Sequence, residues 1–120
     1  MITNYTQYCL ICGKPKDCEH HLLRGSSRKL ADADGITIPL CDNCHTVGRA
    51  LDGKLRADCK IHKNAMAENL SLIIGQLAWE KNCIIELLLF GEGLHGFETT
   101  QEVSDYAREE FRKRYERSWL

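Results

Sequence analysis

Two pairs of cysteines constrain the fold of this chain more than any other feature. The stretches CLIC and CDNC contain Cys9 with Cys12 and Cys41 with Cys44. A C-x-x-C turn brings two thiolates onto one ion, and two such turns supply the four sulfurs of a closed tetrahedral zinc site. Because such a site has no open coordination position, its Zn²⁺ holds the fold and does no chemistry. The spacing therefore predicts a structural zinc that joins two distant parts of the chain.

The other three cysteines, Cys18, Cys59 and Cys83, are expected to have different roles. Cys83 lies in an apolar helical stretch and is expected in the core, while Cys59 in ADCKIH is kept as an alternative zinc ligand. A nucleophilic Cys/His pair involving Cys18 is also considered, although no third residue that would orient it is identified.

The composition favours a soluble protein of the cytoplasm. An odd number of cysteines, seven in 120 residues, argues against a secreted disulfide scaffold. The opening stretch MITNYTQYCLIC lacks the basic and apolar regions of a signal peptide, and the apolar run NCIIELLLF is too short to span a bilayer. We therefore expect a reducing cytoplasm and no membrane partner.

The pattern predicts one α+β domain over residues 1–120, with a change of character near residue 63. Before it, HHLL and ITIPLC resemble strands, RGSSRKLADADG a loop, and HTVGRALDG a short helix. From about Asn64 to Phe90 an amphipathic helix is expected, followed by a last helix that starts near Thr99 with a capping box to Glu102. The apolar stripes of these helices are expected to be core, packed on residues 1–63 or on a second subunit. The stripe of the first helix consists of Met66, Leu70, Ile73, Ile74 and Leu77.

A histidine pair lies between the two cysteine pairs. Neighbouring side chains of a strand point to opposite faces, so His20 and His21 cannot share a site directly. If the strands around EHHLL and ITIPL pair as a hairpin, one of the two histidines comes near His45, which follows the last cysteine of CDNC. One histidine would then bind a second metal with His45, and its neighbour would be left free as a base.

With these pieces in place, residues 9 to about 62 resemble an HNH endonuclease, the ββα-metal nuclease fold in its zinc-knuckle form. The matching stretches are CLIC, EHHL, ITIPLCDNCH and the later IH, in a spacing similar to that of phage-associated HNH proteins related to recombination-promoting nucleases. The resemblance implies a small zinc-stapled ββα-metal module at residues 1–63, followed by two or more α-helices at residues 64–120. It also implies a nuclease that acts on DNA, with phage or recombination proteins as partners.

The resemblance also assigns roles to residues. His21 becomes the general base, His20 and His45 become ligands of a catalytic divalent ion, and His62 matches a later histidine that is either a third ligand or a residue without a role in the site. The ion is Mg²⁺, Mn²⁺, Ni²⁺ or Zn²⁺, and imidazole ligands favour a transition metal. Basic residues near the histidines are expected to hold DNA phosphates. They are Arg24, Arg28, Lys29 and Arg49.

The sequence departs from the family pattern at the middle motif position. There the family usually has Asn or His, and this chain has Ile36. Since that residue is thought to orient the strand that carries the base, a backbone carbonyl or Asp34 is left to hold the ring of His21.

Two other functions are weighed against a nuclease. A formal net charge of −1 argues against binding nucleic acid through bulk charge, although basic residues outnumber acidic ones between residues 19 and 63. The first rival is a non-catalytic zinc module that binds nucleic acid or protein. The second is a thiol redox protein, which the lack of a βαβ pattern around either pair disfavours. A homodimer through the apolar helices is left open.

Overall fold

The computed structural model describes residues 7–91 and 93–120 and has an α+β fold. It combines one two-stranded antiparallel sheet with helices, and the chain divides into two compact units, residues 1–75 and 76–120. Helix α2, Ala65–Phe90, belongs to both units, since its first turns lie in one and its later turns in the other. The units are therefore described one at a time.

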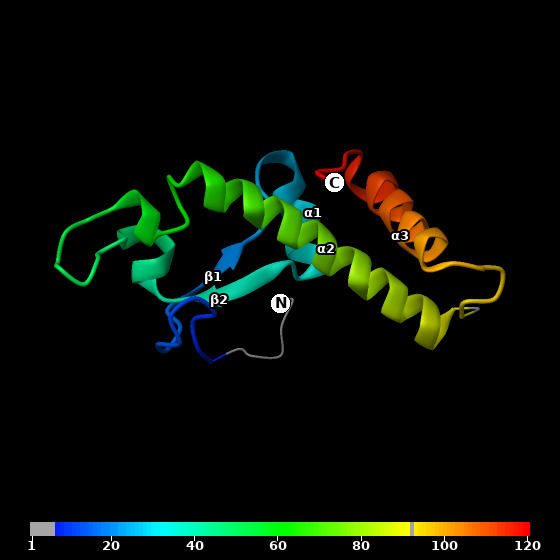
Figure 1. The fold of residues 1–120 in the computed structure, drawn as a ribbon, viewed down its shortest axis with the longest axis horizontal. Coiled ribbons are helices and arrows are strands. Elements are labelled where there is room, and N and C mark those ends of the chain that lie inside the picture. The colour runs from blue at the N-terminus through cyan, green and yellow to red at the C-terminus, as the bar shows by residue number, and fades with distance from the viewer. Residues whose placement is uncertain (1–6, 92) are drawn as a thin grey trace. The chain divides into compact units, whose positions relative to one another are not determined.

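The first unit is built on a hairpin of the kind that the sequence predicts. Strand β1, Cys18–His21, pairs antiparallel with β2, Thr37–Leu40, and the register sets Cys18 opposite Leu40 and His21 opposite Thr37 (Figure 1). Strand β1 begins two residues before the HHLL segment and ends at His21. The register fixes which face of the sheet each histidine occupies, because side chains alternate along a strand.

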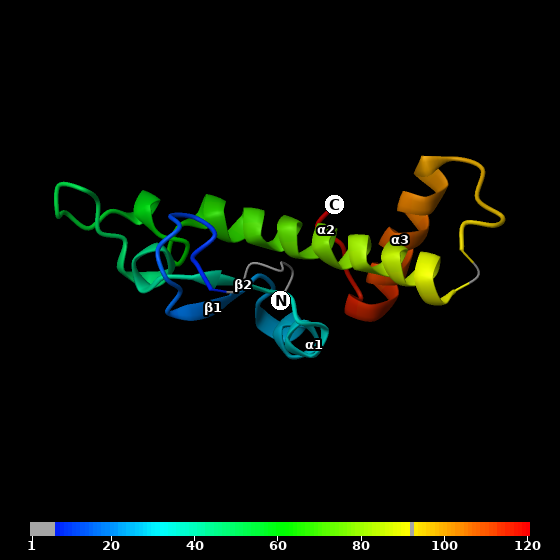
Figure 2. The same ribbon diagram turned by 90° about the horizontal axis from the view of Figure 1, so that it is seen from below.

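The connection between the strands corrects the expected loop. Residues 24–35 contain a 3₁₀ turn η1, Gly25–Ser27, and a two-turn helix α1, Arg28–Asp34, which lies beyond the ends of the two strands in Figure 2. Of the residues that suggested a loop, Gly25, Ser26 and Ser27 make up η1 itself, and Gly35 lies at the end of α1. Gly35 closes α1 with φ of 71°, and its N–H donates to the carbonyls of Ala31 and Asp32. Ala31 anchors the helix, because it is fully buried.

The turn after the second cysteine pair is shorter than the expected helix HTVGRALDG. A π-helical turn η2, Asn43–Val47, ends at Gly48, whose φ is 74°. A Cβ at Gly48 would lie 2.7 Å from the carbonyl oxygen of Arg56, so this position favours glycine both for its positive φ and for the close approach of Arg56. A 3₁₀ turn η3, Ala57–Cys59, precedes α2.

Helix α2 has nearly the expected bounds, but the expectation that its apolar stripe packs into the core of this chain is wrong, and only packing on a second subunit stays a prediction. In this chain Met66, Leu70, Ile74 and Leu77 expose between 47% and 74% of their surface. Apart from Leu72, the buried residues of α2 are small or polar: glycine lets backbone approach closely, and the polar side chains meet partners on neighbouring elements. The buried residues are Ser71, Leu72, Gly75, Gln76 and Glu80.

The second unit packs helix α3, Thr100–Tyr115, around aromatic rings. The predicted capping box is confirmed, since Thr99 Oγ1 accepts from the N–H of Glu102 and the Glu102 carboxylate accepts from the N–H of Thr99. Phe111 is fully buried, and its ring contacts those of Trp79, Tyr115 and Trp119.

Among the described residues, no helix is both long enough and apolar enough to cross a membrane.

A substitution at Gly75 tests the packing of α2 against Leu22, Leu23 and Ile36 of the first unit. An added Cβ would lie 2.9 Å from Leu23 Cδ2, 3.1 Å from Leu22 Cβ and 3.3 Å from Ile36 Cγ2. Alanine improves helix propensity by about 1 kcal/mol, but overpacking costs about 1–3 kcal/mol. We expect Gly75→Ala to lower the free energy of unfolding in urea titration, by about 1 kcal/mol. Ser104→Ala, exposed on α3, is the control and should not destabilise the protein; a more stable Gly75→Ala would contradict this packing.

Candidate metal centres

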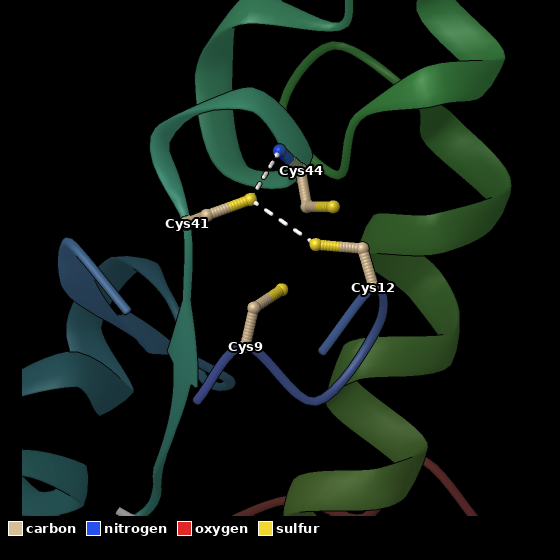
Figure 3. Close-up of side chains that lie close together, drawn as sticks. All are labelled: Cys9, Cys12, Cys41 and Cys44. Atoms are coloured by element: carbon tan, nitrogen blue, oxygen red, sulfur yellow. Dashed lines mark hydrogen bonds between the residues drawn. The ribbon is translucent and has the colours of Figure 1, made fainter. Parts of the chain in front are cut away.

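Four cysteine thiols converge at one end of the hairpin. Figure 3 shows the side chains of Cys9, Cys12, Cys41 and Cys44 facing one another, and their sulfurs all lie within 4.8 Å of each other. Sγ of Cys12 lies 3.6 Å from that of Cys41, and all four residues are free thiols with no disulfide. The buried sulfurs sit in an apolar cluster with Leu40 and Ile61. The two C-x-x-C turns therefore form one group positioned to hold a metal ion.

The electrostatics of this group also favour a cation. Burial raises the pKa of the Cys44 thiol, and the neighbouring thiols of Cys41, Cys12 and Cys9 raise it further. Although burial also raises the pKa of Cys9, backbone N–H groups of Cys12, Cys41 and Ile11 outweigh it and lower that pKa to about 6. Four sulfurs this close cannot all ionise by themselves, whereas a bound cation would stabilise the thiolates together.

Three imidazoles form a second group. One nitrogen each of His20, His45 and His62 lies within 4.8 Å of the others, and Nε2 of His45 is 2.8 Å from Nε2 of His62. His20 comes from β1 and is 4% exposed, and His45 lies in η2. His62 is held beside His45 by its backbone, since its N–H donates to the His45 carbonyl. The structure thus brings His20 near His45, together with His62.

Each imidazole of the second group has a partner outside the group for only one of its nitrogens. Nδ1 of His45 lies 3.3 Å from Sγ of Cys18, which in turn donates to the Leu40 carbonyl. Nδ1 of His62 lies 3.5 Å from Glu68 Oε1 on α2. Nε2 of His20 lies 3.5 Å from Oγ of Ser71, and the Ser71 hydroxyl donates to the Ala67 carbonyl. A histidine that binds a metal commonly donates its other ring N–H in this way.

The remaining nitrogens point to a ligand. With those donations made, Nε2 of His45 and Nε2 of His62 both carry lone pairs, and two lone pairs 2.8 Å apart repel unless a proton or a cation lies between them. Nδ1 of His20 is buried and has no hydrogen-bond partner. Burial, with His45 and His62 nearby, lowers the pKa of His20 to about 4, and burial also lowers that of His45. Neutral rings with unpaired nitrogens are the form that binds a divalent ion.

His21 lies outside this group and is held by a residue that the sequence did not suggest. Its Nε2 is 2.8 Å from Oδ1 of Asp32, and its Nδ1 is 3.5 Å from Nη2 of Arg28. The carboxylate in contact with the ring is thus that of Asp32, where the sequence had suggested Asp34. Ile36, at the middle motif position, is 1% exposed and belongs to the core. The helix that carries Asp32 was expected to be a loop, so no pattern pointed to this contact.

The predicted phosphate-binding residues are all exposed. Arg24 pairs with Glu68 at 2.9 Å, and Arg28 lies beside His21. Lys29 follows Arg28 on α1, while Arg49 donates to the Gly53 carbonyl. Together with Lys14 and Arg56, Arg49 lines a surface hollow beside Cys12 and Cys41.

The remaining cysteines separate into three environments. Cys59 lies outside the four-thiol group and has its sulfur 3.7 Å from Asp58. Cys83 is only half-buried, short of the core position that was expected. Cys18 does lie next to a histidine, His45, although the pKa of its thiol is raised by burial and then by Asp42 and Asp17, which disfavours a nucleophilic thiolate.

Two partners of the histidines had no signal in the sequence. Glu68 and Ser71 lie three residues apart on α2 and contact His62 and His20.

No family model, no curated protein and no solved structure matches this chain.

The four-thiol group predicts a metal that stabilises the fold. We expect Cys41→Ser to lose one metal equivalent per chain and to unfold tens of degrees lower, because a structural metal site can contribute about 10–16 kcal/mol of binding free energy, as much as the whole stability of a small domain. Elemental analysis and thermal unfolding of the purified protein measure both effects. Cys59→Ser is the matched control and should keep the metal and the melting temperature; loss of metal in this control would restore Cys59 as a ligand.

The buried His20 predicts a pH dependence of stability. Between pH 6.5 and pH 4 the unfolded chain binds a proton at His20 that the folded chain does not, so stability falls as the pH falls through this window. Relative to His20→Gln, the wild type should lose up to about 3 kcal/mol between pH 7 and pH 4. Urea titrations of both proteins, with metal at the cysteines only, measure the difference, since metal loss at low pH affects both alike. Parallel pH profiles would contradict it.

Proposed function

We propose that this protein is a metal-dependent DNA endonuclease of the HNH type. A structural Zn²⁺ is held by the four cysteines, a catalytic divalent ion is held by His20, His45 and His62, and His21 is the general base. The observation that carries the proposal is the group of three imidazoles, each with one nitrogen held by a partner outside the group; Nε2 of His45 and Nε2 of His62 face each other at 2.8 Å, and Nδ1 of His20 is buried without a partner. A histidine available as a base adjoins this group in sequence, as the resemblance to HNH nucleases requires.

The roles follow from the chemistry of phosphodiester hydrolysis. His21 takes a proton from water through Nδ1, because its Nε2 is occupied by Asp32. In the free protein Nδ1 accepts from the Arg28 guanidinium, and it becomes available to water when Arg28 turns to the bound phosphate. The water oxygen forms a bond to phosphorus, the bond from phosphorus to the 3′ oxygen breaks, and that oxygen takes a proton from solvent. The ends left are a 5′-phosphate and a 3′-hydroxyl. A divalent ion at the imidazoles supplies electrostatic stabilisation of the charge on the leaving oxygen.

The ligand set favours particular ions. Three imidazoles suit Mn²⁺, Ni²⁺, Co²⁺ or Zn²⁺ better than Mg²⁺, which prefers oxygen ligands. Glu68 adds a negative charge next to His62 without replacing an imidazole. We therefore expect activity with transition metals to exceed activity with Mg²⁺.

DNA contacts are proposed on the basic residues of the first unit. Arg28 lies 3.5 Å from Nδ1 of His21, so a phosphate bound to its guanidinium would be next to the base. Lys29, Arg24 and Arg49 are exposed and are assigned to flanking phosphates, for which Arg24 and Arg49 exchange their contacts with Glu68 and the Gly53 carbonyl.

The rival function is a zinc module without catalysis. It requires only the four-thiol group and predicts one metal per chain. Titration of the zinc-loaded protein with Mn²⁺ separates the two, because the nuclease takes up a second ion and His45→Ala abolishes that uptake.

The proposal predicts metal-dependent cleavage that needs His21. Supercoiled plasmid incubated with the zinc-loaded protein and Mn²⁺, Ni²⁺ or Mg²⁺ should be nicked or linearised. His21→Ala should reduce the rate about 10²- to 10⁴-fold, the usual contribution of a general base. His95→Ala is the matched control, since His95 is exposed in a turn outside the motif and should cut at the wild-type rate. Wild type that cuts with none of these ions, or His21→Ala that cuts as well, would refute the nuclease.

A further inference from the structure

The contact between Asp32 and His21 does more in the proposed function than occupy one ring nitrogen. Asp32 Oδ1 lies 2.8 Å from Nε2 of His21. The contacts of the His45, His20 and His62 rings with Cys18, Ser71 and Glu68 are longer, at 3.3 to 3.5 Å. It joins the end of β1 to helix α1, which is inserted between the two strands. We propose that Asp32 is a positioning residue for His21; this rests on the proposed function, in which His21 is the base.

The contact selects one tautomer of the ring. A carboxylate only accepts hydrogen bonds, so Nε2 of His21 carries the hydrogen and Nδ1 keeps the lone pair. That lone pair is on the side of the ring where Nη2 of Arg28 lies, 3.5 Å away. Asp32 thus turns the proton-accepting nitrogen towards the residue proposed to hold the phosphate.

Helix α1 presents both groups together. Arg28 and Asp32 are four residues apart, one turn of the helix, and each contacts a different nitrogen of His21. The helix itself is fixed by Ala31, which is fully buried, and by the cap at Gly35. A carboxylate on such an anchored helix holds the ring in one orientation, as a residue on a long free loop would not.

This arrangement substitutes for the missing middle residue of the motif. Ile36 is in the core, where its carbonyl accepts from the N–H of Leu22 and so ties it to the end of β1. An apolar side chain there offers nothing to the ring of His21. Asp32, four residues earlier, supplies the missing partner from outside the sheet.

The contact adds little to stability, which makes it testable. The Asp32 side chain is 49% exposed and that of His21 33%, and exposed pairs of this kind contribute at most about 1 kcal/mol. Asp32→Asn should therefore fold normally. Asparagine offers an amide that can also turn its N–H₂ towards the ring, so the tautomer is no longer fixed.

The experiment measures catalysis and the ring separately in the zinc-loaded full chain. With Mn²⁺ and an oligonucleotide duplex, Asp32→Asn should lower kcat at least about tenfold and leave KM within about twofold. Asp32→Glu should recover part of the rate. Asp105→Asn, the same change at an exposed position of α3, is the matched control and should match the wild type in both constants. Equal kcat in Asp32→Asn and wild type would overturn the proposal.

A second readout does not depend on cleavage. Nitrogen-15 chemical shifts of the His21 ring should show hydrogen on Nε2 in the wild type and a mixture of tautomers in Asp32→Asn. Unchanged shifts in Asp32→Asn would overturn the role of Asp32 even where cleavage is seen. If the wild type fails to cut DNA but the shifts respond as expected, the nuclease fails while the positioning of His21 by Asp32 stands.

Discussion

The convergence of four thiols from two short turns is the constraint on which the rest of the first unit depends. Cys9 and Cys12 precede β1, and Cys41 and Cys44 follow β2, so the group closes the open end of the hairpin. A two-stranded sheet is marginal by itself, and its apolar cluster is largely made of these cysteines with Leu40 and Ile61. An ion among the sulfurs would therefore supply stability that so small a core does not.

The same closure sets the positions of the imidazoles. His45 directly follows Cys44, so a shift of that turn would move His45 with it. Its partner Cys18 begins β1 and lies opposite Leu40, next to the thiols. The two groups are thus linked through one thiol and one backbone turn. Helix α2 completes the arrangement, because Glu68 and Ser71 hold the outer nitrogens of His62 and His20.

Helix α2 shows where reasoning from periodicity goes wrong. Its apolar spacing predicts the helix, and the helix has those bounds, yet the side with Met66 and Leu70 is exposed. The buried side contains Gly75, where Leu22 and Leu23 lie too close for a larger residue, and Ser71 and Gln76, which have specific polar partners. Hydrophobicity ranks residues by transfer free energy, and it has no information about such pairwise contacts.

The features that can be predicted from the sequence are those that depend on residues close together in the chain. A C-x-x-C turn, the capping box of Thr99 and Glu102 and the alternation of His20 and His21 along a strand depend on residues only a few positions apart. The tertiary structure alone decided the partners of the histidines. Asp32 reaches His21 from a helix that resembled a loop, and His62 meets His45 through a backbone contact across seventeen residues. Such contacts depend on how separate elements pack, which a pattern of neighbouring residues does not specify.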